Sequence, residues 1–203
     1  MISALRADAF VEPQGAGSGL TIRKAAMRDI APILELINGY AARGVMLPRT
    51  EFEMSEAIRD FSVVMAGDSL KGCGALHFYT PQIAEVRSLA VREEAKTMGV
   101  GRRLVESLVE EAQEYELEAV FAFTYVTEFF QKVGFQVVER GVLPLKAWKD
   151  CLRCPKFNAC DEVAVLRILR RERWPEGIPE GWGQETGKSP ESCFIQIPKP
   201  RQK

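Results

Sequence analysis

The stretch AEVRSLAVREEAKTMGVGRRLVESLVEE, residues 84–111, predicts a strand, a glycine loop and a helix. Residues 84–91 are rich in β-branched and small side chains, which suits a strand. Gly99 and Gly101 follow, and a glycine there lets the backbone approach a ligand closely. A helix N-terminus behind the loop presents unpaired N–H groups and a positive dipole end, so we expect a site for a phosphate or pyrophosphate. The helical stripe consists of Leu104, Val105, Leu108 and Ala112.

Other glycine-rich phosphate sites are excluded by spacing. No Gly-x-x-x-x-Gly-Lys-Ser/Thr pattern occurs, so the chain is not a P-loop nucleotidase. Leu104 occupies the third glycine position of the dinucleotide fingerprint, which excludes that class as well. A tight turn without a ligand remains the alternative interpretation of the two glycines.

Composition points to one ordinary globular domain. The chain has 203 residues, of which 46 % are hydrophobic, enough for a core. Its net charge of −1 gives no global attraction to nucleic acid or a membrane. No apolar run approaches the roughly 20 residues needed to span a bilayer. The N-terminus lacks the pattern of a secretory signal, so we expect a cytoplasmic protein whose five cysteines are reduced thiols.

The order of predicted elements is β-α-α-β-β-β-α-β-α-β-β, an α/β fold with a mixed central β-sheet flanked by helices. Helices are expected after Asp29, after a Thr50/Glu53 capping box, from Arg102, and after Thr127. We expect a flexible arm over 1–19, one domain over 20–169, and a tail rich in Pro, Gly and charge over 170–203. The expected strands are 20–24, 61–65, 72–79, 84–91, 119–124, 136–139 and 163–169.

Residues 96–101, KTMGVG, resemble the acetyl-CoA loop of the GNAT acetyltransferases, whose pattern is Gln/Arg-x-x-Gly-x-Gly/Ala. Residues 129–135, FFQKVGF, resemble the FYxxxGF segment of that family, and the element order matches over about residues 20–169. Lys96 stands where Gln or Arg is usual and still supplies a cation. Phe130 replaces the tyrosine that many members use as general acid, so the acid must come from elsewhere or from water. The resemblance implies the GNAT fold, with acetyl-CoA as co-substrate.

Further segments are similar to the acetyltransferases that make N-acetylglutamate for arginine biosynthesis. The implied reaction transfers the acetyl group to the α-amine of L-glutamate in a ternary complex, without a covalent enzyme intermediate. The chain is too short for the amino-acid-kinase domain of the long synthases, so we expect no arginine feedback through such a domain. The similar segments are 36–40 LINGY, 44–50 GVMLPRT, 72–77 GCGALH, 84–91 AEVRSLAV and 121–125 FAFTY, with 143–146 LPLK and 151–157 CLRCPKF typical of the short version.

The resemblance also implies where acetyl-CoA binds. The pantetheine arm is expected along the edge of the strand at Leu89, Ala90 and Val91. Lys96 adds positive charge beside the pyrophosphate. Arg102 and Arg103 place positive charge at a helix N-terminus, where it opposes the helix dipole, and a bound anion would remove that conflict. The alternative interpretation is that both arginines are solvated in the first turn of the helix and bind no ligand. The main chain expected to hold the pyrophosphate comprises Gly99, Val100, Gly101, Arg102 and Arg103.

Catalysis requires a base for the α-ammonium group, a donor to the oxyanion and an acid for the thiolate. Glu85 matches an acidic position proposed as the base in related synthases; a solvated carboxylate or an ion pair with Arg87 is the alternative. The amide of Leu89 or Ala90 is the expected oxyanion donor. Tyr125 is the candidate acid, against the alternative of an ordinary sheet tyrosine.

The acceptor carries two carboxylates, which arginine binds best through its planar fork. Arg49 matches an arginine of the related synthases and is our first candidate. Arg87, Lys146 and Lys156 are further candidates, and a surface cation is the alternative for each. Two rival functions remain open: a GNAT enzyme for glutamine or another small amine, and a non-catalytic acyl-CoA-binding regulatory module. Whether the chain forms a homodimer is also open.

The cysteine segment has a spacing that zinc sites use. Cys151 and Cys154, with Cys160 further on, could form part of a zinc knuckle, although its fourth ligand, His77 or Asp161, is not evident. We prefer a structural loop of reduced thiols and expect no metal. His77 is the single histidine, which argues against a multi-histidine metal protein and against a Ser-His-Asp hydrolase.

Overall fold

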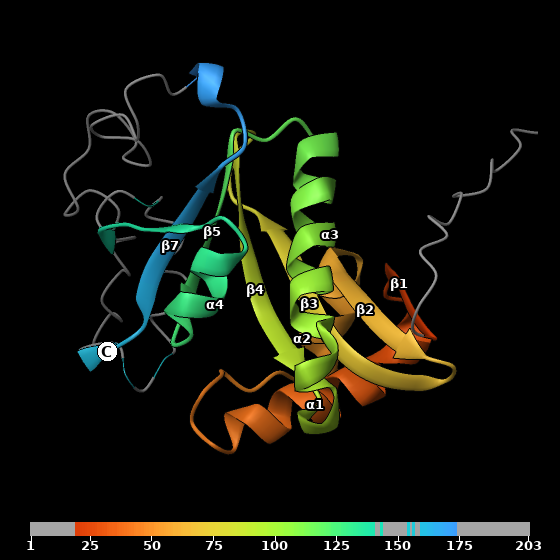
Figure 1. Cartoon of the computed structure of the whole chain (residues 1–203). Coiled ribbons are helices and arrows are strands. Elements are labelled where there is room, and N and C mark those ends of the chain that lie inside the picture. The colour runs from red at the N-terminus through yellow and green to blue at the C-terminus, as the bar shows by residue number, and fades with distance from the viewer. Residues whose placement is uncertain (1–18, 141–142, 144–153, 155, 157–158, 174–203) are drawn as a thin grey trace, which may run out of the picture.

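Seven strands form one mixed sheet in the order β1-β2-β3-β4-β5-β7-β6 in the computed structural model (Figure 1). The structure describes residues 19–140, 143, 154, 156 and 159–173. The β4–β5 pair is parallel, and the other pairs are antiparallel. The strands are β1 Leu20–Lys24, β2 Phe61–Ala66, β3 Ser69–Phe78, β4 Ile83–Val91, β5 Ala119–Thr124, β6 Gln136–Val137 and β7 Val163–Ile168.

Helices cover both faces of this sheet (Figure 1). α3 and α4 pack on one face, and α1 and α2 pack on the other. The predicted α/β fold, a mixed sheet flanked by helices, is therefore confirmed. The helices are α1 Ile30–Ala41, α2 Glu51–Ala57, α3 Val100–Glu114 and α4 Thr127–Lys132, with 3₁₀ turns at Met27–Asp29, Ile58–Asp60, Glu93–Met98 and Arg171–Arg173.

The sequence signals for α2 and α3 are borne out in detail. The Thr50 hydroxyl accepts from the Glu53 N–H at 3.2 Å, and the Glu53 carboxylate accepts from the Thr50 N–H at 2.9 Å. This reciprocal pair satisfies two donors that a helix start leaves unpaired. On α3 the predicted apolar stripe is fully buried against the sheet: Leu104, Val105, Leu108 and Ala112.

Several local expectations differ from the structure. Thr127 is the first residue of α4 and not its cap, β3 begins at Ser69 instead of residue 72, and α3 begins at Val100 instead of residue 102. Asp29 stands before α1, but its side chain makes no cap hydrogen bond. The carboxylate instead accepts from the Arg23 guanidinium at 2.7 Å and from the Ala26 N–H at 2.7 Å, and the bond from Arg23 lowers the pKa of Asp29. The segment between β4 and α3 is also more ordered than a simple loop, because Glu93–Met98 forms a 3₁₀ turn.

Glycine in β3 sets how closely α3 approaches the sheet. A Cβ atom at Gly72 would lie 2.8 Å from Val100 Cγ1 and 3.0 Å from the Ala90 carbonyl oxygen. Because real Cβ atoms do not come so close, a larger residue would push the first turn of α3 away from β3. Close packing on β3 therefore fixes the position of the first turn of α3 on the sheet.

The ends of the domain are only partly described. Most of the predicted arm, 1–19, and of the predicted tail, 170–203, lies outside the described residues. Among the helices that are described, none has the length and apolar character required to cross a membrane.

Candidate active site

β4 and β5 pair over only three residues, from Ile83 to Glu85 on β4, opposite 119–121 on β5. Beyond Glu85 the two strands diverge, as Figure 1 shows. β4 continues to Val91, paired with β3 on its other side. Main-chain groups of the second half of β4 therefore face a gap in the sheet, where an extended ligand with amide groups can pair with them.

A bulge interrupts β4 beside this gap. Cys73 pairs with Ala90 and Ala75 pairs with Arg87, so Ser88 and Leu89 together lie opposite Gly74. Ser88 has φ of 53°, an unusual value for a residue with a side chain. An extra residue of this kind turns a main-chain amide out of the ladder. The bulge thus redirects the strand at the residues predicted to supply the oxyanion donor.

Side-chain packing supports this bulge from behind. The buried Cys73 thiol donates to the Ser88 carbonyl at 3.8 Å, and Cys73 pairs with Ala90 in the β3–β4 ladder. Burial raises the pKa of Cys73 to about 12, so the group stays a thiol. A Cβ atom at Gly74 would lie 3.2 Å from Leu89 Cδ1, which leaves little space for a larger residue there. Because Ala90 is engaged with Cys73, Leu89 is the better of the two candidate donors.

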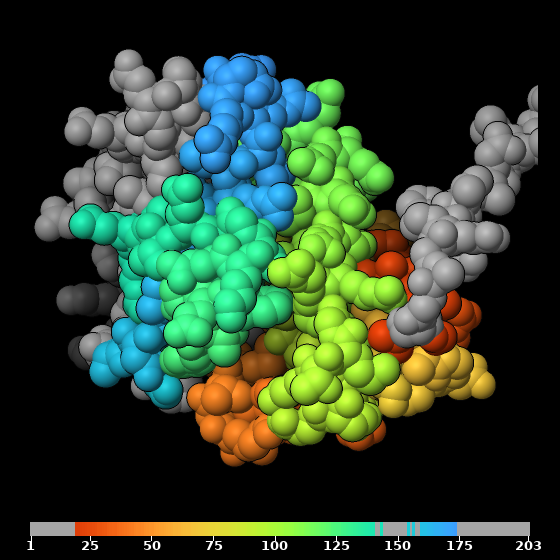
Figure 2. Space-filling model, viewed as in Figure 1, coloured from red at the N-terminus to blue at the C-terminus, as the bar shows by residue number. Residues whose placement is uncertain are grey.

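The first turn of α3 lies at the molecular surface, shown in yellow-green in Figure 2 between α4 and the orange α1–α2 region. Gly99 precedes the helix with φ of 73°, and a Cβ atom there would meet nothing within 4 Å. The first turn contains no acidic residue. On the α4 side, a Cβ atom placed on Gly101 would lie 3.4 Å from the ring of Phe129. The amides of this turn are therefore accessible to an anion.

The predicted cations at this turn already have partners in the protein. Lys96 Nζ lies 2.8 Å from the Glu93 carboxylate, and this bond raises the pKa of Lys96. Arg103 Nη1 donates to the Leu20 carbonyl at 3.4 Å, so its side chain reaches toward β1. Arg102 is exposed and lies 4.0 Å from Glu106. Main-chain amides, more than side-chain charges, make this turn suitable for an anion.

Glu85 lies where the β4–β5 pairing ends, and it is only 9 % exposed. In the sheet, Glu85 lies opposite His77 on β3 and opposite Phe121 on β5. Its Oε2 accepts from the Tyr79 hydroxyl at 3.0 Å, and the His77 Nδ1 lies 2.8 Å from Asp60 Oδ2. A buried carboxylate beside the gap is well placed for proton transfer. The solvated-carboxylate alternative does not fit this burial.

Arg49 is half-buried in the segment between α1 and α2. The side chain of Asn38 fixes its backbone, accepting from the Arg49 N–H at 2.9 Å and donating to the Arg49 carbonyl at 3.0 Å. Arg87 is half-buried on β4, two residues after Glu85 and therefore on the same face. The candidate Lys146 lies outside the described residues.

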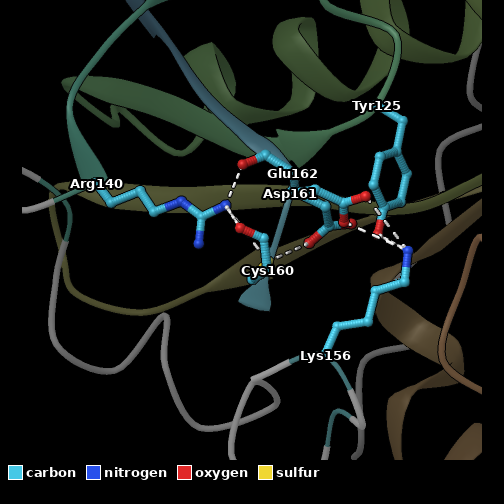
Figure 3. A network of polar contacts seen from close by, with 6 residues as sticks. All are labelled: Tyr125, Arg140, Lys156, Cys160, Asp161 and Glu162. Atoms are coloured by element: carbon cyan, nitrogen blue, oxygen red, sulfur yellow. Dashed lines mark hydrogen bonds and ion pairs between the residues drawn. The ribbon is translucent and has the colours of Figure 1, made fainter. Parts of the chain in front are cut away.

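Tyr125 and Lys156 belong to a polar network at the end of β5 (Figure 3). Lys156 Nζ donates to the Tyr125 hydroxyl at 3.2 Å and lies 3.3 Å from Asp161. Partial burial raises the pKa of Tyr125, which Lys156 opposes, so the phenol keeps its proton at neutral pH. On the other side of the network, Arg140 donates to the carbonyl oxygens of Cys160 and Glu162. The bonds from Arg140 hold the chain leading into β7 against the segment that follows β6.

A family model described as the acetyltransferase (GNAT) family matches residues 35–135. An uncharacterised N-acetyltransferase of Chlorobaculum tepidum is 40 % identical over 148 residues, covering 73 % of this chain and 96 % of that protein. The chain belongs to the GNAT family. GNAT acetyltransferases take an acetyl group from acetyl-CoA, which is therefore the co-substrate of this chain.

Two other proteins are informative for comparison with this GNAT chain. An amino-acid acetyltransferase of Mycobacterium tuberculosis is 32 % identical over 135 residues, covering 65 % of this chain and 77 % of that protein. The N-acetylglutamate synthase of Neisseria gonorrhoeae, solved with coenzyme A and N-acetyl-glutamate, superposes with a TM-score of 0.68 at 28 % identity. That match covers 75 % of this chain and 35 % of the Neisseria chain, so the present chain spans about a third of it.

The structure offers a GNAT co-substrate a suitable surface. The open left-handed Gly99 leaves room for a phosphate at the α3 amides, and the gap beside the second half of β4 suits an amide-containing arm. Phe130, which replaces the family tyrosine, is 3 % exposed and packs edge-to-face on Phe129 and Phe135. It is a core residue, and Tyr125 remains the candidate acid.

The zinc hypothesis finds no support in the described part of the chain. No group of three His, Cys, Asp or Glu residues there could hold a metal ion. Cys154 and Cys160 are half-buried free thiols, and Cys151 lies outside the described residues. His77, one suggested fourth ligand, is paired with Asp60.

Two surface hollows among the described residues lie away from this region. One of about 410 Å³ is lined by the β3–β4 turn and the C-terminal end of α3, including Phe78 and Tyr115. A polar one of about 220 Å³ adjoins it, with Arg170 and Arg173 at its wall. Both are at the opposite end of α3 from Gly99.

Sequence reasoning missed four features of this region. These are the bulge at Ser88, the thiol of Cys73 behind it, the fixing of Arg49 by Asn38, and the bond from Tyr79 to Glu85. Only the bulge had a sequence signal. Gly74 sits inside an otherwise regular strand, and such a glycine often marks a bulge or a close backbone approach.

Proposed function

We propose that this chain transfers the acetyl group of acetyl-CoA to the α-amine of L-glutamate and so makes N-acetylglutamate for arginine biosynthesis in the cytoplasm. The observation that carries the proposal is the buried Glu85 at the point where β4 and β5 diverge, with Arg87 on the same face. An acid-base group and a cation there suit an ammonium group that belongs to an acidic molecule. The N-acetyl-glutamate complex of the similar Neisseria synthase supports this choice of acceptor.

In the proposed mechanism acetyl-CoA lies with its pyrophosphate on the amides of Gly99 to Arg103 and its arm along Leu89 to Val91. Arg49 and Arg87 bind the carboxylates of glutamate, with Lys156 as an additional cation. Glu85 takes a proton from the α-ammonium group, directly or through water. The freed amine nitrogen then attacks the thioester carbonyl carbon, which places negative charge on the carbonyl oxygen.

The Leu89 amide donates to that oxygen, since the bulge turns it out of the ladder. The carbon–sulfur bond then breaks, and Tyr125 donates a proton to the departing sulfur. The nitrogen loses two protons in all. One restores Tyr125 and the other leaves to solvent through Glu85, so the reaction yields the amide, the free thiol of CoA and one proton.

The deciding experiment is a thiol-release assay with acetyl-CoA and a panel of amino acids, with products identified by mass spectrometry. We expect release that depends on glutamate, with N-acetylglutamate as product. Thiol release with glutamine or another amine, and none with glutamate, would show that the proposed acceptor and the proposed pathway are wrong. Bound acetyl-CoA without release for any amine would favour a non-catalytic acyl-CoA-binding module.

A further inference from the structure

A half-buried tyrosine contacts the proposed base directly. The Tyr79 hydroxyl donates to Glu85 Oε2 at 3.0 Å. Tyr79 lies just after β3 and Glu85 lies on β4, so the bond crosses between neighbouring strands. A hydrogen bond to one carboxylate oxygen restricts the rotation of the carboxylate.

The ring of Tyr79 is itself held on two sides. His77 packs edge-on against it with ring centroids 5.1 Å apart, and Phe121 lies at 5.6 Å. His77 is in turn fixed by Asp60 at 2.8 Å. The hydroxyl therefore reaches Glu85 from a ring whose position is set by β3, β5 and the turn after α2.

We propose that Tyr79 is a positioning residue of Glu85: its hydroxyl orients the carboxylate toward the acceptor amine. This inference rests on the proposed role of Glu85 as base. A hydrogen bond from a neutral donor stabilises the charged form of a carboxylate, whereas burial favours the neutral form. At 9 % exposure Glu85 has little water to take over that task, so the bond from Tyr79 opposes the effect of burial.

Two groups that can carry a charge lie close to Glu85 in the sheet. His77 lies opposite on β3 and is bonded to Asp60, and Arg87 follows two residues along β4. On β5 Phe121 lies opposite Glu85, and the buried cluster of β5 and β7 to which Phe121 belongs is apolar.

The test compares Tyr79→Phe with the unchanged chain in the pH dependence of kcat/KM for the acceptor. A base must be deprotonated, so kcat/KM falls as the pH drops through its pKa. Loss of the donor makes Glu85 easier to protonate, which moves the acid limb to higher pH by about one unit, the shift that a bond of about 1.5 kcal/mol to a charged group gives. We also expect kcat to fall about tenfold, with the KM for acetyl-CoA changing less than twofold.

Two variants make the result specific. Tyr115→Phe changes a tyrosine at the same end of the sheet that packs on Phe78, and its profile should match the unchanged chain. Glu85→Gln should lose the acid limb altogether. Because misfolded protein lowers the rate equally at every pH, the position of the limb can be read even if Tyr79→Phe is partly inactive.

The outcomes separate the two proposals. One outcome is that the acid limb of the pH profile has the same position in Tyr79→Phe as in the unchanged chain and is lost in Glu85→Gln. That result overturns the role of Tyr79 and leaves Glu85 as the base. A limb that persists in Glu85→Gln overturns the role of Glu85 itself, and the role of Tyr79 with it. A limb shifted in Tyr79→Phe but not in Tyr115→Phe supports the inference.

Discussion

The first turn of α3 presents consecutive main-chain amides, whereas the face around Glu85 gathers side chains from separate segments. Gly99 to Arg103 are adjacent in sequence and are fixed as a unit by the packing of Val100 on Gly72. By contrast, Arg49 precedes α2, Glu85 lies on β4, and Tyr125 follows β5. The first region depends on backbone shape, and the second on the relative placement of distant elements.

This difference predicts how each region responds to mutation. A main-chain site tolerates most side chains and fails only when the backbone or the local charge changes. A side-chain site loses one function with each residue while binding at the other region persists. The following substitutions test that contrast, from the largest expected effect to the smallest.

Glu85→Gln should have the largest effect. We expect kcat to fall about 100- to 1,000-fold, because general base catalysis contributes about that much. The dissociation constant for acetyl-CoA, measured by calorimetry, should change less than twofold, since the α3 amides are untouched. If the affinity for acetyl-CoA fell by as large a factor as kcat, the first turn of α3 and the face around Glu85 would not act as separate regions.

Gly99→Asp should weaken acetyl-CoA binding about 100-fold, or about 2.7 kcal/mol. Aspartate places a negative charge beside the amides and strains a backbone with φ of 73°. Gly99→Asn is the matched control, because asparagine tolerates this backbone and carries no charge; a loss of about fivefold is expected. Equal losses for the two variants in a calorimetric titration would remove the anion site from the first turn of α3.

Arg49→Ala should raise the KM for glutamate about 10- to 50-fold, since a charged hydrogen bond contributes about 1.5–3 kcal/mol. The KM for acetyl-CoA should stay within twofold. Arg59→Ala is the control, because Arg59 is an exposed arginine on the turn after α2. Steady-state kinetics in both substrates would decide, and equal rises in the two KM values would indicate a folding defect instead.

Tyr125→Phe should lower kcat about tenfold, and Lys156→Met about threefold. The phenol is the proposed acid, and Lys156 holds it at 3.2 Å without being consumed. Because burial raises the pKa of Tyr125, the phenol is protonated throughout neutral pH, and the deficit of Tyr125→Phe should be constant from about pH 6 to pH 8. A rate equal to that of the unchanged chain would assign the proton to water.

The fold and the α3 turn were predictable because their signals are local. The stripe from Leu104 to Ala112, the Thr50 capping box and the two glycines each act within a few residues, and the structure contains the element that each predicts. The parallel β4–β5 pair follows once a helix connects the two strands.

The arrangement around Glu85 was not predictable from local patterns. The bond from Tyr79 depends on the register of β3 against β4, and the fixing of Arg49 depends on how α1 meets the following segment. The Asp29 cap failed for the same reason: an arginine from β1, six residues earlier in the chain, competes for the carboxylate. Tertiary contacts decide such cases, and no spacing rule contains them.

The thiol behind the β4 bulge could also serve as an internal reporter. Cys73 is fully buried and its pKa is about 12, so in the folded chain it is neither accessible nor a thiolate at neutral pH. A maleimide or disulfide reagent can reach it only when the sheet opens. The rate at which Cys73 is alkylated, followed by peptide mass spectrometry beside the half-buried Cys154 and Cys160, therefore measures how often this core opens, and acetyl-CoA should slow it by binding only the closed form.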